Sequence, residues 1–188
     1  MPVLDTGELR KGLTIIVDGE LCKIIDYEHN KRGRGTANVR LTLRNLRTGA
    51  ITERTFMAGT KFEQAFLDRR VVQYLYHDGS TYYFMDTETY EQPAVPAEVL
   101  GDAVYYLREG ESVELVTYEG EIIDVDLPPA VVLRVAHAEI GVRGDTAAGA
   151  TKPVTLETGL VVNVPLFINE GDLVKVDTRT GQYLERAS

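Results

Sequence analysis

The chain has 188 residues, enough for one large domain or several small ones, and its 44% hydrophobic content is ordinary for a globular protein. It contains no apolar window of about 18 residues and no apolar run behind a basic N-terminal head, which argues against a membrane or exported protein and predicts a cytoplasmic location. The single cysteine, Cys22, excludes an internal disulfide framework, and its apolar neighbours indicate a half-buried strand residue. The formal net charge of -9 argues against general affinity for nucleic acid.

The charge is divided unevenly along the chain. Residues 1–64 carry a net charge of +3, residues 65–127 a net charge of -11 and residues 128–188 a net charge of -1. Positions 29–52 hold no acidic residue and six basic ones: Lys31, Arg32, Arg34, Arg40, Arg44 and Arg47. Because a guanidinium pairs bidentately with phosphate, this basic stripe is either a phosphate-binding surface or a solvated strand face. The acidic middle of the chain would repel a phosphate backbone.

Short apolar or alternating runs predict β-strands along the whole chain. In the first two thirds they cover residues 14–17, 22–25, 39–43, 71–76, 81–85, 112–118 and 121–125. In the last third they cover residues 130–138, 160–164, 173–176 and 182–184. Helical signal is limited to a turn or two at 61–66 and at 96–100. The predicted fold class is all-β, built from small barrels or sandwiches.

Two breaks in the pattern predict module boundaries. Gly59-Thr60-Lys61 precedes the reversal of charge, and Pro128-Pro129 cannot lie inside a sheet ladder. We therefore expect three modules of about sixty residues, each near the lower limit for independent stability. Their expected ranges are 1–64, 65–127 and 128–188.

The stretch from Asn30 to Arg40 predicts a basic finger. Apolar residues are missing there, strands are expected on both sides, and Gly33 and Gly35 flank Arg34. Two glycines allow a tight turn and a close approach to another chain, which would present Arg34 at the tip of a hairpin.

The finger lacks the spacing of a nucleotide-binding loop. Neither G-x-x-x-x-G-K-[ST] nor G-x-G-x-x-G occurs, so no nucleotide or other cofactor is expected. Lys31, Arg32 and Arg34 could instead engage several phosphates of an RNA backbone, with an affinity that is independent of sequence and falls with salt.

No catalytic or metal-binding constellation is evident. Asp124 and Asp126 share one exposed strand face, and Ser80 lies in a turn without the context of a serine nucleophile. The three histidines are far apart and lack zinc-ligand spacing. The sequence argues against an enzyme. A long polar, glycine-rich loop is expected at 141–153, serving either a function or only as a connector.

Several ordered motifs resemble those of bacterial translation elongation factor P. They are the finger at 30–40, LRNLRTG at 43–49, FMDTETYEQ at 84–92, GVRGDT at 141–146, KPVTLETG at 152–159, VPLFI at 164–168 and VDTRTG at 176–181. The resemblance covers essentially the whole chain. It implies an SH3-like (KOW-like) N-terminal barrel followed by two OB-fold barrels in an L shape that mimics the outline of a tRNA.

The resemblance also implies a function and its partners. Such a factor binds the ribosome between the peptidyl-tRNA site and the exit site, contacts both subunits, and relieves stalling at consecutive prolines. The finger would reach the CCA end of peptidyl-tRNA, and the C-terminal module would lie near the small subunit and the mRNA. The protein is expected to act as a monomer without a membrane, a metal or a catalytic residue of its own.

Individual residues follow from the matching motifs. Arg34 matches the fingertip position that carries a modified lysine in many relatives, so lysine attachments cannot apply there; a modifying enzyme for arginine remains open. Lys31, Arg32, Gly33 and Gly35 would contact RNA beside it. Gly144, Asp145 and Thr146 match a loop that contacts mRNA, and two C-terminal residues match positions that touch tRNA or ribosomal RNA, namely Tyr183 and Arg186.

Other readings stay open at this point. The runner-up is a single-strand RNA-binding OB protein unrelated to translation, in which exposed aromatics would stack on bases. Its candidate residues are Tyr74, Tyr76, Tyr82, Tyr83, Tyr105 and Tyr106, of which alternation predicts about half to be core. The elongation-factor-P-like paralogue shares the implied architecture, and an enzyme such as a small hydrolase comes last.

Overall fold

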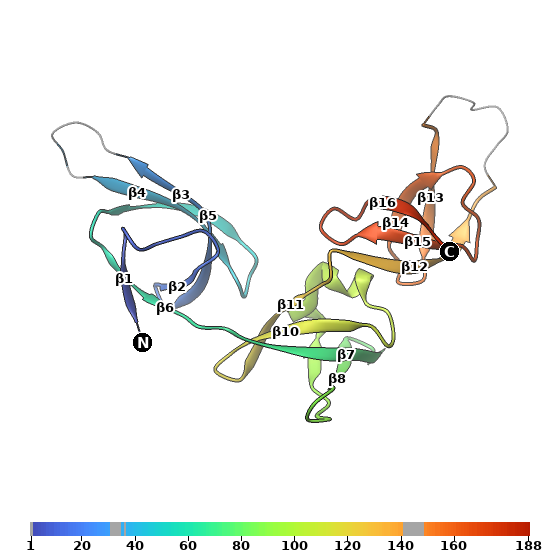
Figure 1. Cartoon of the computed structure of the whole chain (residues 1–188), viewed down its shortest axis with the longest axis horizontal. Helices are drawn as coiled ribbons and strands as arrows, with labels where there is room; N and C mark the ends of the chain where they lie inside the picture. Colours follow the sequence, from blue (N-terminus) through green and yellow to red (C-terminus); the bar gives the residue numbers. More distant parts are fainter. Residues whose placement is uncertain (1, 31–34, 36, 141–148) are drawn as a thin grey trace. The chain divides into compact units, whose positions relative to one another are not determined.

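The structure is a computed structural model that describes residues 2–30, 35, 37–140 and 149–188. These residues form three antiparallel sheets with one short helical segment, as Figure 1 shows. The predicted all-β class is therefore confirmed. The chain divides into two compact units, Met1–Arg69 with Val116–Asp124, and Arg70–Leu115 with Val125–Ser188.

The first sheet has the strand order β1-β6-β2-β3-β4-β5. Its strands are β1 (Val3–Asp5), β2 (Thr14–Val17), β3 (Glu20–Asn30), β4 (Asn38–Asn45), β5 (Ile51–Met57) and β6 (Lys61–Gln64). Strands β3 and β4 are among its longest, and they lie side by side as a hairpin (Figure 1).

Alternation along β4 explains how this sheet forms its core. Val39, Leu41 and Leu43 are buried, while Arg40 between them and Arg44 after them are exposed. The inward residues pack with side chains of neighbouring strands, among them Ile15, Ile24 and Phe62. A strand with one buried and one solvated face is what a period-two pattern predicts, and the expectation for residues 39–43 is confirmed.

The prediction of a helical turn at residues 61–66 is wrong. Lys61–Gln64 is strand β6, which lies between β1 and β2 with Glu63 opposite Val3 and Gln64 opposite Ile15. Phe62 is buried there and contacts Phe56 edge to face at 4.9 Å between ring centroids. Sheet pairing and this aromatic contact outweigh the weak local helix propensity of the segment.

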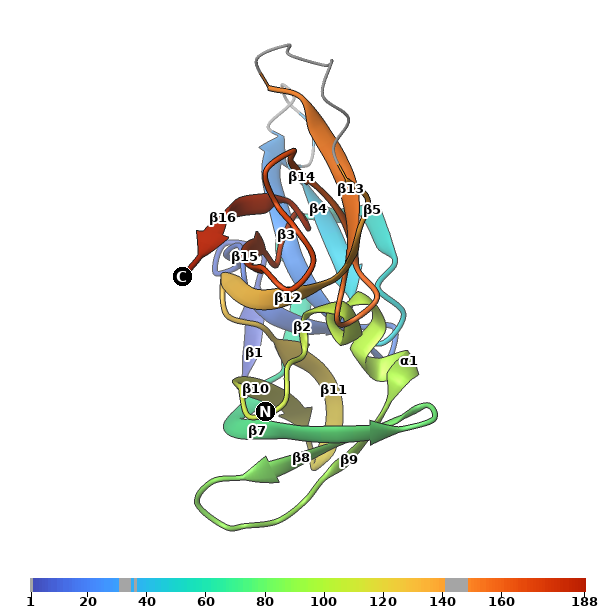
Figure 2. The same cartoon turned by 90° about the vertical axis from the view of Figure 1, so that its right-hand side faces the viewer.

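The second sheet has the strand order β11-β10-β7-β8-β9. Its strands are β7 (Asp68–Asp78), β8 (Thr81–Asp86), β9 (Ala94–Pro96), β10 (Ser112–Tyr118) and β11 (Glu121–Asp126), with α1 (Ala97–Leu100) and η1 (Gly101–Tyr106) after β9. Figure 2 shows β7 and β8 next to one another below α1. The helical turn predicted at 96–100 is confirmed. In the first unit, Val116 and Ile123 pack against Leu21 and Ala65.

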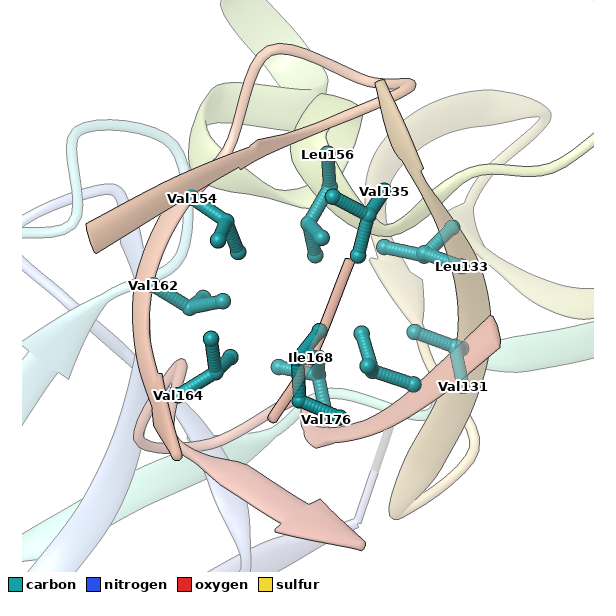
Figure 3. Close-up of a cluster of buried hydrophobic side chains, with 10 residues drawn as sticks. Val131, Leu133, Val135, Val154, Leu156, Val162, Val164, Ile168 and Val176 are labelled. Carbon is teal, nitrogen blue, oxygen red and sulfur yellow. The ribbon is translucent and has the colours of Figure 1, made fainter. Parts of the chain in front are cut away.

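The third sheet has the strand order β14-β13-β12-β15-β16. Its strands are β12 (Ala130–Ala138), β13 (Thr151–Leu156), β14 (Val161–Pro165), β15 (Leu173–Asp177) and β16 (Tyr183–Ala187). Strands surround a purely apolar centre, into which the side chains labelled in Figure 3 point. Leu133, Val164 and Ile168 are completely buried in it. Such a filled interior is typical of a small barrel.

The expected loop at 141–153 ends earlier than predicted. Thr151, Lys152 and Pro153 belong to β13, where Pro153 lies opposite Asn163 of β14. Burial of alternate residues, including Val154 and Leu156, explains why this segment joins the sheet. A proline and a lysine at its start concealed the strand pattern in the sequence.

Candidate nucleic-acid interface

The β3–β4 hairpin carries the predicted finger. Its ladder runs from the pair Cys22 and Asn45 to the pair Asn30 and Asn38, with one bulge near Ile25. In sequence, Arg34 is four positions from each member of the last pair. Gly35 is exposed, and the other residues predicted to contact RNA here lie outside the described residues: Lys31, Arg32, Gly33 and Arg34. The hairpin itself is confirmed, and the contacts of its tip stay a prediction.

The base of the finger is fixed to two other parts of the first sheet. The Tyr27 hydroxyl donates a hydrogen bond to the carbonyl oxygen of Thr6 at 3.0 Å. Thr6 is buried, and its hydroxyl accepts the N–H of Gly59 at 2.8 Å. The N–H of Ala58 donates to the carbonyl of Ala37 at 2.8 Å, on the other side of the hairpin. These bonds tie the base of the hairpin to the segment after β1 and to the turn between β5 and β6.

Two of the three arginines of the basic stripe outside the fingertip, Arg40 and Arg47, face acidic partners. Arg47 Nη2 lies 3.0 Å from Glu121 Oε2, and Arg40 Nη1 lies 3.9 Å from Glu28 Oε2. Arg44 is exposed and lies opposite Lys23 in the ladder. Pairs on the surface stabilise a fold by less than about 1 kcal/mol. Their main effect is to neutralise part of the positive field of Arg40 and Arg47.

The second predicted contact region follows β12. Gly144, Asp145 and Thr146 lie outside the described residues. The described ends of their connection are Ile140, which is 93% exposed, and Gly149, which is also exposed. A buried lysine beside this connection, Lys152, was missed by sequence reasoning, since a lysine is normally assigned to the surface.

Two predicted C-terminal contacts have different environments. Tyr183 is half-buried, packs against the apolar centre of the third sheet and lies opposite Val176. Arg186 is exposed, and its Nη2 lies 3.9 Å from Asp172 Oδ1. Packing is thus an evident role for Tyr183, whereas the guanidinium of Arg186 is accessible to a phosphate.

Tyrosines of the second sheet divide between core and surface. Tyr74 is buried, and burial is the main cause that raises the pKa of its phenol to about 12. Tyr82 stacks on His77 at 5.0 Å between ring centroids. Tyr76 is 48% exposed and stacks on Tyr83 at 4.8 Å. In each stacked pair, one face of each ring is covered by the other ring. Less aromatic surface is therefore free to stack on bases than the number of tyrosines suggests.

Reactive side chains give no sign of a catalytic centre in the described part of the chain. Cys22 is buried, and this burial raises the pKa of its thiol, which disfavours the nucleophilic thiolate. Among the described residues, His, Cys, Asp and Glu side chains do not gather in groups of three that could hold a metal ion. None of the described helices is long and apolar enough to cross a membrane.

Family models match nearly the whole chain in three consecutive parts. Residues 5–62 match the elongation factor P (EF-P) KOW-like domain, residues 67–125 the elongation factor P OB domain, and residues 131–186 the elongation factor P C-terminal domain. The three matches correspond in order to the three sheets, and the architecture is a KOW-like domain followed by two OB-type domains.

Curated relatives can be aligned with this chain over their full length. Elongation factor P of Moorella thermoacetica and that of Desulforudis audaxviator are each 51% identical over 185 residues, covering 98% of this chain and 100% of the relative. A solved structure, eukaryotic translation initiation factor 5A from Methanococcus jannaschii, superposes with a TM-score of 0.54 at 26% identity over 66% of this chain and 93% of that one. The chain belongs to the elongation factor P family of translation factors.

Proposed function

We propose that the protein binds the ribosome between the peptidyl-tRNA site and the exit site and stimulates peptide-bond formation at consecutive prolines. The observation that carries this proposal is the β3–β4 finger, which has a braced base and an arginine midway in sequence between the last paired residues. It stands in a chain that is 51% identical over 185 residues to an elongation factor P. Partners are then the two ribosomal subunits, peptidyl-tRNA and mRNA, and the place of action is the cytoplasm.

Arg34 would brace the CCA end of peptidyl-tRNA. Proline has a fixed φ and a secondary amine, so peptidyl-tRNA ending in proline can rest in an unproductive pose. A guanidinium held on a hairpin binds backbone phosphates in a fork geometry and restricts the poses available to the reacting ends. The gain is positional, and the ribosome's own centre performs the covalent step.

The remaining contacts would orient the molecule. Lys31 and Arg32 add charge beside the tip, and Gly33 and Gly35 allow close approach of the two backbones. Gly144, Asp145 and Thr146 would contact mRNA from the C-terminal module, and Arg186 would contact a tRNA or ribosomal RNA phosphate. The acidic module at 65–127 would keep its own face away from RNA.

Substitution at the fingertip tests this proposal. Arg34→Ala is expected to slow synthesis of a triprolyl-containing peptide in a reconstituted translation system, while synthesis of a proline-free peptide stays unchanged. Arg44→Ala is the matched control, because it removes the same charge from an exposed position at the base of the same hairpin. Proline-run synthesis at the wild-type rate by Arg34→Ala would exclude the fingertip role. Intact mass spectrometry of the protein from its native host would show whether Arg34 carries a modification.

Tyr76 is 48% exposed and stacks on the half-buried Tyr83, which is the reason to test a second function, single-strand RNA binding away from the ribosome. This function requires tight binding to free RNA at physiological salt, which the net charge of -9 opposes. Fluorescence anisotropy with a labelled single-stranded RNA distinguishes the two functions. Weak binding agrees with the ribosomal role, and tight, sequence-tolerant binding supports the alternative.

A further inference from the structure

Lys152 occupies an inward-facing position of β13. It is only 7% exposed and shares its strand face with Val154 and Leu156 of the apolar centre. A buried ammonium is costly unless it is well hydrogen-bonded, and a hydrophobic residue would fit this face without that cost. The charge at this position therefore calls for a structural or functional reason.

The ammonium of Lys152 supplies a hydrogen-bond donor between β12 and β13 at a position where the backbone of β13 has none. Its Nζ donates a hydrogen bond to the carbonyl oxygen of Glu139 at 2.8 Å. Regular pairing of β12 with β13 stops at Ala138 and Val154, and one step further Glu139 would face Pro153. Proline has no N–H, so β13 offers no backbone donor at that step. The side chain of Lys152 supplies the missing donor.

A second side chain holds the same end of β12 from its other flank. The N–H of Ala138 donates to Glu170 Oε1 at 3.1 Å, and this oxygen lies 3.1 Å from Nδ1 of His137. Glu170 belongs to the segment before β15, the other neighbour of β12. The last residues of β12 are thus fixed by Lys152 on one side and by Glu170 on the other.

We propose that Lys152 is a positioning residue for the connection between β12 and β13. By holding the Glu139 carbonyl, it fixes the point and direction in which the chain leaves the third sheet toward Gly144, Asp145 and Thr146. The inference rests on the proposed function for its consequence, since a fixed exit point lowers the entropy lost when that connection binds RNA. Loss of the ammonium should weaken binding and leave the maximal rate of the assisted reaction intact.

Amide hydrogen exchange of the full-length protein tests the structural part. Lys152→Met keeps the volume of the stem and removes the ammonium. Exchange at Ala138, whose N–H is held by Glu170 at this end of β12, is expected to become roughly tenfold faster when the strand end loses the hydrogen bond from Lys152. Lys175→Met is the matched control, because Lys175 is a half-exposed lysine of the same sheet whose ammonium pairs with Glu185 at 3.4 Å. Unchanged exchange in Lys152→Met overturns the inference.

The set of residues whose amide exchange becomes faster distinguishes a loss of global stability from a local effect. If Lys152→Met unfolds at the assay temperature, Lys152→Gln replaces it, because its amide is a neutral and shorter donor. Faster exchange confined to the end of β12 at Ala138, with β15 protected as in the wild type, supports the positioning role. Uniformly faster exchange across the third sheet overturns it.

Titration of the factor in triprolyl peptide synthesis tests the functional part. For Lys152→Met, the half-saturating concentration should rise roughly tenfold with an unchanged rate at saturation. A companion variant, Asp145→Ala with Thr146→Ala, tests the RNA contact itself. If the half-saturating concentration rises for the companion variant and stays normal for Lys152→Met, the inference about Lys152 is overturned and the proposed function stands. Normal values for both variants overturn the proposed loop contact, and with it the functional consequence of Lys152.

Discussion

The phenol of Tyr27 on β3 donates a hydrogen bond to the carbonyl oxygen of Thr6, 21 positions earlier in the chain, at 3.0 Å. Thr6 is buried and accepts the Gly59 N–H through its own hydroxyl. Two hydrogen bonds therefore join the base of the finger to the segment after β1 and to the turn between β5 and β6. These hydrogen bonds support the hairpin from outside its own ladder, which the proposed role of the finger as a brace requires.

Tyr27→Phe is expected to lower the free energy of unfolding by about 1 kcal/mol, the usual contribution of a single hydrogen bond. Urea unfolding followed by circular dichroism measures this change. Tyr90→Phe is the control, since Tyr90 is 72% exposed and its hydroxyl should contribute little. Equal stabilities for Tyr27→Phe and the wild type would show that water replaces the Thr6 contact at no cost.

One turn geometry recurs in all three sheets. Asn45 Oδ1 accepts the N–H groups of Arg47 and Thr48 at 2.9 and 3.1 Å. Asp86 Oδ1 accepts those of Glu88 and Thr89 at 2.8 and 3.1 Å, and Asp177 Oδ1 those of Arg179 and Thr180 at 2.7 and 3.2 Å. Side chains of Asn and Asp commonly replace a backbone acceptor in this way. Three of the sequence motifs typical of the family, at 43–49, 84–92 and 176–181, are therefore turn motifs.

Asp86→Asn should make the stability of the protein less dependent on acid. The two backbone N–H groups lower the pKa of the Asp86 carboxyl, with a further contribution from Arg70, whose Nη1 lies 3.5 Å from Oδ2. A carboxyl with a lowered pKa stabilises the folded state above its unfolded value, near 4, and this contribution is lost as the pH falls through the folded value. Asparagine has no such titration, and Asn45 shows that an amide oxygen can form the same turn.

Thermal unfolding of wild type and Asp86→Asn at pH 7 and at pH 3 measures this effect. The wild type should be the more stable protein at pH 7, and the difference should shrink at pH 3. Asp78→Asn, which changes a carboxylate at the end of the neighbouring strand, controls for the general effect of removing one negative charge. A constant difference between wild type and Asp86→Asn over this range would mean that the carboxyl titrates alike in the folded and unfolded states.

Alternation made most strands predictable, and its absence explains the misses. β4 could be predicted because Val39, Leu41 and Leu43 are buried on one face. β5 was not predicted, because nearly all of its residues are exposed at the edge of the sheet and carry no period-two pattern. β13 was not predicted at all, because Lys152 occupies one of its core positions and only Val154 and Leu156 remain as apolar residues on that face.

The residues of the finger themselves predicted the hairpin, whereas the side chains around it are placed by contacts between residues far apart in sequence, which the sequence does not reveal. Glycines on both sides of Arg34 predicted a hairpin, and the pairing of Asn30 with Asn38 agrees with it. The ion pair of Arg47 with Glu121 joins positions 74 residues apart, so the sequence could not show that acids partly neutralise the basic stripe. In the same way, the hydrogen bond between Lys152 and the Glu139 carbonyl depends on the register of two strands.

Two equivalent glycines in the recurring turn allow backbone strain and steric contact to be separated. Gly49 and Gly181 each donate their N–H to the carbonyl four positions earlier at 2.8 Å, with φ of 76° and 73°. Alanine at either position has to adopt a left-handed backbone, which costs about 1 kcal/mol. A Cβ at position 49 would meet nothing within 4 Å, whereas one at position 181 would lie 3.0 Å from Oη of Tyr106.

Gly181→Ala is therefore expected to be more destabilising than Gly49→Ala. The tyrosine cannot move away freely, since Tyr106 packs against the apolar centre of the third sheet. We expect Gly49→Ala to lose about 1 kcal/mol and Gly181→Ala about 2 kcal/mol or more, because overpacking adds to the backbone strain. Urea unfolding of both variants measures the difference, and the double variant Gly181→Ala with Tyr106→Phe isolates the contact with the hydroxyl. If removal of that hydroxyl returns the loss at position 181 to the value at position 49, the contact with Oη accounts for the excess; equal losses in the two single variants would contradict it.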